Sequence, residues 1–196
     1  MWHRLRPFSL NPDNGKKLRL LRACRILKQG GIIAHETGTL PGIAANPHSR
    51  RSVQRLQQFK QRRGPFLLLA DSTRTALHLA RFFSPELRKQ ARQSWPGPVT
   101  LVFAARPGLP KSCYQHSMLA VRVDADAATR RAAKYCGGLL LSSSLNRRGG
   151  VVCSPDWKSH MRWHSHLNGR VSGMDAEGSP SAIIRIWRNS STMIRP

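Results

Sequence analysis

The sequence predicts a single α/β domain in which helices pack against a mixed sheet. Helical patterns alternate along the chain with short runs of apolar and β-branched residues, an order that is typical of α/β domains. The chain has 196 residues, of which 40% are hydrophobic, so it is long enough to bury a core within one domain. No apolar run approaches the roughly 18 residues that a membrane-spanning helix requires.

The segment 94–103, Ser-Trp-Pro-Gly-Pro-Val-Thr-Leu-Val-Phe, is the clearest local signal. Two prolines flank Gly97, so the helical pattern before them must end at about Ser94. From Val99 onwards the residues are β-branched, apolar or aromatic, which indicates a short buried strand. Thr100 interrupts this run. Its hydroxyl group either faces a ligand or bonds a neighbouring carbonyl oxygen.

The other elements are predicted from apolar spacing and from cap, stop and turn signals. Residues 1–14 form an arm that ends in a turn-like Asn-Pro-Asp-Asn-Gly sequence, and the domain proper covers 15–196. Ser49 is a candidate helix cap, and paired glycines follow two of the helices. Predicted helices cover 16–29, 49–60, 73–82, 85–93 and 125–136. Predicted strands cover 32–34, 66–70, 99–103, 119–123, 139–141 and 181–187, with an irregular loop at 36–42 and irregular structure over 148–178.

The chain is strongly basic. Thirty-three Lys and Arg residues against nine Asp and Glu residues give a formal net charge of +24, and the excess is spread along the chain. A positive field of this size favours polyanions, nucleic acid first, through phosphate contacts that weaken steeply with salt. The alternative is a basic surface that serves only solubility. Arginine pairs recur at 50–51, 62–63, 130–131 and 147–148.

The cysteines indicate a reducing compartment. They are scattered and form no C-x-x-C pair, which favours reduced thiols over a disulfide framework or a zinc site. The first residues carry charge without a following apolar segment, so we expect no secretory signal and a cytoplasmic location. The cysteines are Cys24, Cys113, Cys136 and Cys153.

Three histidines lie close together in the sequence at positions 160, 164 and 166. A pair of histidines four residues apart on a helix can bind a metal ion. The interleaved Trp157, Arg162 and Trp163 are more typical of a nucleic-acid surface or of a plain loop. We therefore expect no metal site.

Cationic and hydroxyl side chains gather at the predicted strand ends and loops, where carboxylates are nearly absent. Such a set suits the binding of phosphates and of a carboxylate substrate, and it does not suit paired-acid hydrolysis or a carboxylate-bound metal. The sequence contains neither a P-loop nor a Rossmann fingerprint. The candidate residues are Thr37, Lys60, Arg62, Thr100, Arg122, Ser142, Ser144, Asn146 and Ser181.

The order of these residues carries more information than any one of them. A Pro-Gly-Pro-x-Thr strand and a serine-rich S-x-S-x-N turn are specific in combination, and further segments at 33–37, 60–62, 120–122 and 180–181 accompany them. Over about residues 16–188 the chain resembles the YrdC-like family, the threonylcarbamoyl-AMP synthases of the TsaC type. The resemblance implies a twisted mixed sheet flanked by helices, with a concave basic surface.

The resemblance also implies a function. The family joins L-threonine, bicarbonate and ATP into threonylcarbamoyl-adenylate and pyrophosphate, a nucleotidyl transfer on the way to threonylcarbamoyladenosine in tRNA. ATP is then a substrate, Mg2+ is expected to arrive with it, and the expected macromolecular partners are tRNA or double-stranded RNA and other tRNA-modification proteins. The alternative is a non-catalytic protein that binds nucleotide or double-stranded RNA on the same fold.

Residue roles carry over from the family position by position. The residues expected to face ATP or the adenylate are Lys60, Thr100, Ser144 and Asn146. The residues expected to hold threonine are Thr37, Arg122, Ser142 and Ser181. Lys60 and Arg62 are the expected catalytic residues, with Arg62 at the phosphate end.

The chain departs from the family pattern mainly in the loop Glu36–Gly42. Gly38 stands where the family usually has glutamate, Glu36 stands where it has proline, and Pro41 replaces an aromatic residue. Leu145 replaces a small alanine between two residues that are expected to face the nucleotide.

Overall fold

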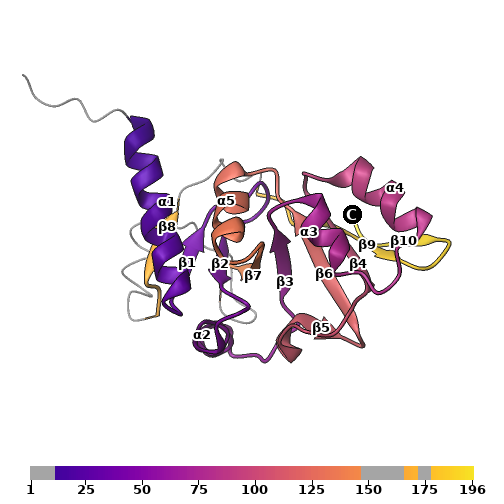
Figure 1. Ribbon diagram of the computed structural model, residues 1–196, viewed down its shortest axis with the longest axis horizontal. Helices are drawn as coiled ribbons and strands as arrows, with labels where there is room; N and C mark the ends of the chain where they lie inside the picture. Colours follow the sequence, from indigo (N-terminus) through magenta and orange to yellow (C-terminus); the bar gives the residue numbers. More distant parts are fainter. Residues whose placement is uncertain (1–11, 147–165, 172–177) are drawn as a thin grey trace, which may run out of the picture.

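The computed structural model of the protein describes residues 12–146, 166–171 and 178–196. Helices and short strands alternate along this part of the chain (Figure 1). The helices are α1 (Pro12–Lys28), α2 (Arg50–Lys60), α3 (Thr73–His78), α4 (Pro85–Ser94), α5 (Ala127–Tyr135) and the short 3-10 helix η1 (Lys111–Cys113). The strands are β1 (Ile32–His35), β2 (Gly42–Ala45), β3 (Leu67–Ala70), β4 (Val99–Ala104), β5 (Tyr114–Gln115), β6 (Met118–Val123), β7 (Leu139–Ser144), β8 (Gly169–Val171), β9 (Ala182–Ile186) and β10 (Ser191–Arg195).

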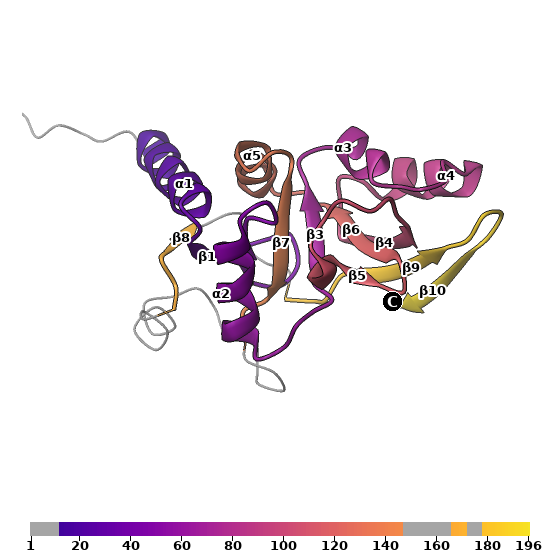
Figure 2. The same cartoon turned by 60° about the horizontal axis from the view of Figure 1, so that its bottom comes forward.

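The strands form one mixed sheet in the order β10-β9-β4-β6-β3-β7-β2-β1-β8, and β5 pairs with β6 outside this path. The pairs β1–β8, β3–β6 and β4–β9 are parallel, and the others are antiparallel. The strand direction turns between β7 and β9 (Figure 2), which is the twist expected of such a sheet. The predicted fold class, a mixed sheet with flanking helices, is confirmed.

The centre of the sheet is buried on both faces. Leu69 and Leu140 lie in a core cluster with residues of α1 and α5, whereas Leu68 and Leu141 lie in a second cluster with residues of α2. Successive residues of a strand point to opposite faces, so neighbouring leucines enter different clusters. This explains why the central strands have continuous apolar sequences instead of alternating ones.

Three of the predicted helix boundaries are confirmed in detail. The Ser49 hydroxyl caps α2 by accepting a hydrogen bond of 3.3 Å from the backbone N–H of Ser52. The helix α4 ends at Ser94, directly before the Pro-Gly-Pro segment. After α5, Gly137 and Gly138 adopt φ angles of 78° and 95°, the left-handed region in which glycine has no Cβ penalty.

Other boundaries differ from the prediction. The helix α1 begins at Pro12 rather than Lys16, because proline is well tolerated in the first turn of a helix. The residues 12–14 therefore belong to α1 and not to the predicted arm. The helix α3 ends at His78 instead of Phe82, and Ala80 forms an isolated bridge with Ala105 on the sheet.

Four strands are not indicated by the sequence pattern. The strand β2 consists of glycine and small apolar residues next to a Gly- and Pro-rich loop, and it pairs with β1 and β7. The strands β5 and β8 are only two and three residues long. The strand β10 lies largely exposed beyond the last predicted element, at the edge of the sheet.

The described residues contain no helix that is long and apolar enough to cross a membrane. Cys24, Cys113 and Cys136 are free and buried. Burial raises the pKa of the thiols of Cys113 and Cys136 to about 12, so these two groups are packing residues rather than nucleophiles. Cys153 lies outside the described residues.

Of the three clustered histidines, only His166 lies among the described residues, and its ring meets Phe59 edge-on at 6.1 Å between centroids. His160 and His164 lie outside them, as do Trp157, Arg162, Trp163 and the rest of 148–165. Within the part of the chain that the structure describes, no group of three or more His, Cys, Asp or Glu could hold a metal ion.

Candidate active site

A cavity of about 240 Å³ opens between the loop that follows β1 and the ends of β7, β9 and β10. Hydroxyl groups and arginines dominate its wall, and no carboxylate is among the described lining residues. This chemistry suits an anionic ligand that also accepts and donates hydrogen bonds. The lining residues are Thr37, Thr39, Leu40, Gly42, Arg62, Leu67, Arg122, Ser142, Ser143, Ser144, Pro180, Ser181 and Arg195.

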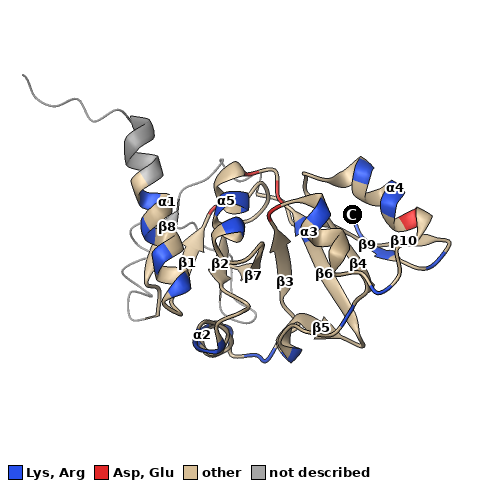
Figure 3. Ribbon diagram, viewed as in Figure 1, with Lys and Arg blue, Asp and Glu red and all other residues tan. Residues whose placement is uncertain are grey.

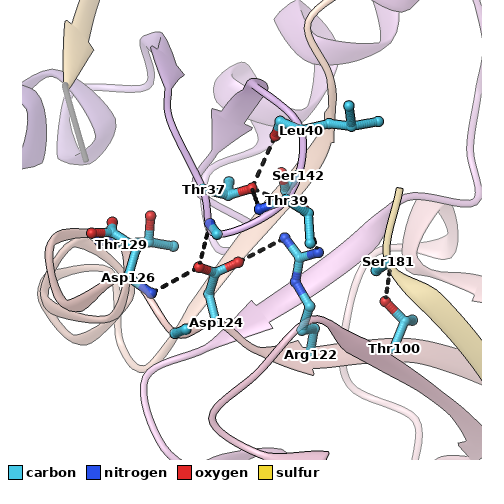
Figure 4. Close-up of polar contacts among 12 residues, drawn as sticks. Thr37, Thr39, Leu40, Thr100, Arg122, Asp124, Asp126, Thr129, Ser142 and Ser181 are labelled. Carbon is cyan, nitrogen blue, oxygen red and sulfur yellow. Dashed lines mark hydrogen bonds and ion pairs between the residues drawn. The ribbon is translucent and has the colours of Figure 1, made fainter. Parts of the chain in front are cut away.

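Arg122 lies at the floor of the cavity, on β6, and is held from two sides (Figure 4). Its Nη2 forms an ion pair of 2.7 Å with Oδ2 of Asp124, and the two side chains are only 4% and 1% exposed. Its Nη1 donates a hydrogen bond of 2.7 Å to the Thr39 hydroxyl. The Nε–H of Arg122 is buried and has no hydrogen-bond partner among the described residues. A guanidinium has five N–H groups, so these two contacts leave further donors on Nη1 and Nη2 for a ligand in the cavity.

Asp124 also orders the loop that departs from the family pattern. Its Oδ1 accepts hydrogen bonds from the backbone N–H groups of Gly38 (3.0 Å) and Asp126 (2.9 Å). A Cβ atom at Gly38 would lie 3.4 Å from that same oxygen. A carboxylate is thus present beside position 38, where the resemblance leads us to expect a glutamate.

The threonines of this loop stabilise a tight turn. The Thr37 hydroxyl donates to the Leu40 carbonyl oxygen at 2.9 Å and accepts from the backbone N–H of Thr39 at 3.1 Å. The two threonine hydroxyls are 3.1 Å apart. The loop is therefore ordered internally and, through Thr39, is joined to Arg122.

His35 supports the opposite wall. Its Nε2 lies 3.1 Å from the Ser142 hydroxyl, and the imidazole is 3% exposed. A Cβ at Gly42 would lie 2.7 Å from that nitrogen, so only glycine fits opposite the ring. Burial lowers the pKa of His35 to about 4, so the imidazole is neutral at pH 7.

The protein is expected to lose stability as the pH falls from about 6.5 towards 4, because the unfolded chain then binds a proton that folded His35 does not. The contribution from His35 is fully present above pH 6.5 and amounts to roughly 3 kcal/mol. Urea unfolding at pH 7 and at pH 4.5 measures it. In His35→Gln, which does not titrate, the difference between the two pH values should shrink by about 2 kcal/mol, the part of the contribution that is lost by pH 4.5. An unchanged difference would contradict the prediction.

Lys60, the last residue of α2, joins that helix to the serine-rich turn after β7. Its Nζ donates to the carbonyl oxygens of Ser144 (2.9 Å) and Asn146 (2.6 Å) and to the Asn146 side-chain oxygen (2.7 Å). That side-chain oxygen also accepts from the Ser144 hydroxyl at 2.8 Å. Burial, together with the positive charge of Arg62, lowers the pKa of Lys60 to about 8.

Arg62 is exposed and reaches over the mouth of the cavity. Its guanidinium stacks on Phe66 at 5.0 Å and contacts the Ser143 hydroxyl at 3.4 Å. Gln61 closes α2 in the left-handed conformation, with a φ of 51°, so the chain turns between Lys60 and Arg62. Because of this turn, the buried ammonium group of Lys60 and the exposed guanidinium group of Arg62 both contact residues 143–146.

Thr100 does not bond a neighbouring carbonyl. Its hydroxyl lies 3.0 Å from that of Ser181, the residue before β9, because β4 and β9 pair in parallel. The Ser181 carbonyl oxygen accepts two hydrogen bonds from Arg195 at the end of β10. Thr100 lies behind the cavity wall and reaches the cavity only through Ser181.

The structure therefore brings most of the predicted residues together. Thr37, Arg62, Arg122, Ser142, Ser144 and Ser181 line the cavity. Lys60 and Asn146 contact Ser144 but do not themselves line the cavity. Thr100 contacts Ser181 and is separated from Lys60 and Asn146. Sequence reasoning missed Thr39, Ser143, Arg195, His35 and Asp124 as members of the site.

The profile of the Sua5/YciO/YrdC family, described as "Telomere recombination", matches residues 25–196 of the chain. The chain belongs to this family. The match includes every residue of the cavity wall.

Two curated relatives cover most of this chain and most of their own length. The threonylcarbamoyl-AMP synthase of Methylococcus capsulatus is 33% identical over 170 residues, which is 82% of this chain and 89% of the relative. The protein of the same name from Nitrosococcus oceani is 32% identical over 179 residues, which is 89% of this chain and 96% of the relative.

Solved structures share the fold. Sua5 of P. abyssi, crystallised with L-threonine, has a TM-score of 0.81 at 22% identity. This chain matches over 90% of its own length and spans about half, 53%, of that protein. YciO of E. coli has a TM-score of 0.79 at 17% identity and is covered over 89% of its length. At such identities the likeness supports the fold and not the activity.

Proposed function

We propose that this chain is a threonylcarbamoyl-AMP synthase, which makes threonylcarbamoyl-AMP and pyrophosphate from L-threonine, bicarbonate and ATP. The relatives of that name align over most of both chains. The observation that carries the proposal is the cavity in which a buried arginine, several hydroxyl groups and an exposed arginine converge, with no carboxylate among the described lining residues.

Threonine would lie at the floor of the cavity. Arg122 would pair with its carboxylate, because a guanidinium held on two sides presents its remaining N–H groups in fixed directions. The hydroxyls of Thr37, Ser142 and Ser181 surround this position and would bond the amino and hydroxyl groups. The neutral imidazole of His35 would keep the Ser142 hydroxyl oriented.

ATP would lie along the wall formed by the turn 144–146. Bicarbonate and the threonine amine would first condense to a carbamate with loss of water. A carbamate oxygen would then attack the α-phosphorus, and the bond to the departing pyrophosphate would break. Lys60 and Arg62 would neutralise the charge that develops on the phosphates, and Mg2+ that enters with ATP would offset part of the same charge. Catalysis would come mainly from positioning and charge neutralisation.

We also propose that the protein acts in the cytoplasm on the pathway to tRNA threonylcarbamoyladenosine and contacts RNA. The net charge of +24 supports an anionic macromolecular partner.

Pyrophosphate release by the purified protein tests the proposed reaction. With ATP present, we expect release only when both L-threonine and bicarbonate are supplied, because the carbamate is the nucleophile. L-Serine, which lacks the methyl group of threonine, is the matched control for substrate recognition. Release of inorganic phosphate is measured in parallel to detect simple ATP hydrolysis.

Release that requires neither threonine nor bicarbonate would contradict the proposal. If no pyrophosphate appears while equilibrium dialysis shows that ATP binds, the family member is a nucleotide-binding protein without turnover. In that case the changed loop at Gly38 would be the first region to restore by mutation.

A further inference from the structure

A second and larger hollow lies at the opposite end of β9 from the candidate active site. Ser181, just before β9, lines the active-site cavity, whereas Ile186 and Trp187, at the other end of the strand, line this hollow. Its volume is about 1040 Å³, and it shares no lining residue with the first cavity. We call it the β9-end groove; its walls are the 81–87 segment, the end of β4 and the β9–β10 turn.

Three large aromatic side chains of the β9-end groove face solvent. Phe82, Phe83 and Trp187 are 62%, 50% and 49% exposed, in a chain that buries most of its large apolar residues. Each ring has an arginine guanidinium over it. The distances to the ring centroids are 5.4 Å for Arg81 on Phe82, 4.3 Å for Arg88 on Phe83 and 5.7 Å for Arg185 on Trp187.

The surroundings of the groove are basic. At Pro85 it adjoins a second hollow of about 410 Å³ along α4, lined by Arg88, Lys89 and Arg92. No carboxylate is among the described lining residues of either hollow. Glu86, on the same helix, accepts hydrogen bonds from Gln90 and Ser191. Figure 3 shows blue segments on α3, α4 and the β9–β10 hairpin and a red segment on α4.

We propose that the β9-end groove binds a single-stranded segment of nucleic acid. Exposed aromatic rings that carry guanidinium groups are stacking platforms for unpaired bases, and the cations of α4 form a track for the phosphates. Both parts are needed for such a ligand, and both are present side by side. A paired duplex would offer its phosphates to α4 but not its base faces to the rings.

An acidic peptide is the competing ligand class. It would be attracted by the same cations, but its flexible side chains do not supply the planar faces that three exposed rings can stack with. The presence of rings, guanidinium groups and a cationic track together therefore favours nucleic acid. The inference does not depend on the proposed synthase reaction, because the two cavities have no residue in common.

Fluorescence anisotropy with a short labelled single-stranded RNA tests the proposal on the full chain. The same sequence as single-stranded DNA, the matching RNA duplex and a polyglutamate peptide are the other probes. We expect both single strands to bind more tightly than the duplex and the peptide, since stacking tolerates either sugar. Tighter binding of the peptide would overturn the proposal and make the groove a protein-docking surface, and tighter binding of the duplex would also overturn it.

Leucine substitutions isolate the contribution of base stacking, because leucine keeps an apolar side chain and removes only the planar aromatic ring. Phe83→Leu and Trp187→Leu should each weaken single-strand binding about tenfold. Tyr135→Leu is the matched control: Tyr135 is 46% exposed and has Lys28 over its ring at 5.8 Å, but it lies on α5, away from the groove. Equal losses at Tyr135 and in the groove would overturn the proposal. Pyrophosphate release should be unchanged in all three variants.

The salt dependence isolates the phosphate contribution. The double substitution Arg88→Gln with Arg92→Gln should lower the slope of log affinity against log salt by about 1.4, since each phosphate contact on a single strand contributes about 0.7. The control pair Arg50→Gln with Arg131→Gln removes the same charge from α2 and α5. An equal change of slope in both pairs would show binding by net charge alone and would refute a specific groove.

Discussion

Replacing Lys60 by methionine is expected to lower threonine-dependent pyrophosphate release about a thousandfold. Methionine keeps the length of the side chain and its packing but removes the ammonium group. That group donates to three oxygens of the 144–146 turn at 2.6 to 2.9 Å. Its loss therefore removes a charge beside the proposed ATP site and also the hydrogen bonds that hold the turn. The loss of this donor by the partly buried oxygens of the turn should also lower the free energy of unfolding by about 1–3 kcal/mol.

The pH dependence separates the charge of Lys60 from its structural role. Because the pKa of Lys60 is lowered to about 8, its charged form is lost as the pH rises through that value. The kcat/KM for ATP, which reports the free enzyme, should therefore fall above pH 8. Lys60→Arg should remain charged, so its kcat/KM for ATP should not fall above pH 8. Lys89→Met on α4 is the control, and full activity of Lys60→Met would refute the assignment.

The local features of the fold could be predicted because each depends on a short stretch of sequence. The Ser49 cap, the end of α4 before the Pro-Gly-Pro segment and the buried strands all depend on neighbouring residues. The strand β10 could not be predicted in this way. Its residues are largely exposed and show no clear alternation of apolar and polar side chains. The strand forms because its backbone pairs with β9. Arg195 reaches the site only through that pairing.

The assembly of the site depends on long-range pairing that spacing does not reveal. Lys60 meets Asn146 across 86 positions, and Arg122 meets Thr39 across 83. The pairing of β7 with both β2 and β3 brings Ser142 opposite Ala44 and Leu67 and so fixes its wall of the cavity. The predicted residues were found from their residue types and from the family resemblance, whereas Thr39, Ser143, Arg195, His35 and Asp124 were not predicted.

Asp124 is the clearest of these, and the sequence held a signal for it. Arg122 and Asp124 are two residues apart at the end of β6, and residues so spaced on a strand point to the same face. An acidic residue two positions after the arginine that we propose binds threonine, with a glycine where the resemblance leads us to expect glutamate, indicates a carboxylate supplied from another element. The Gly38 N–H bonded to Asp124 is the contact that joins the two.

Asp124→Asn is accordingly expected to lower kcat/KM for threonine about a hundredfold while changing the KM for ATP little. The amide is isosteric and can still accept from Gly38 and Asp126, but it leaves the guanidinium of Arg122 buried without its counter-charge. Breaking a buried pair from one side should also cost about 3 kcal/mol of unfolding free energy. Titrating both substrates at saturating bicarbonate measures the effect on activity, and urea unfolding measures the effect on stability.

Asp126→Asn is the matched control for this variant. Asp126 lies two residues away and caps α5 by accepting a hydrogen bond of 2.7 Å from Thr129, a role that asparagine also fills. It removes the same charge from the same region without touching Arg122. If the two variants lost threonine affinity equally, the regional charge would be responsible. A loss confined to Asp124→Asn, partly restored by adding Gly38→Glu, would show that the carboxylate beside the loop serves the threonine site from a new position in the chain.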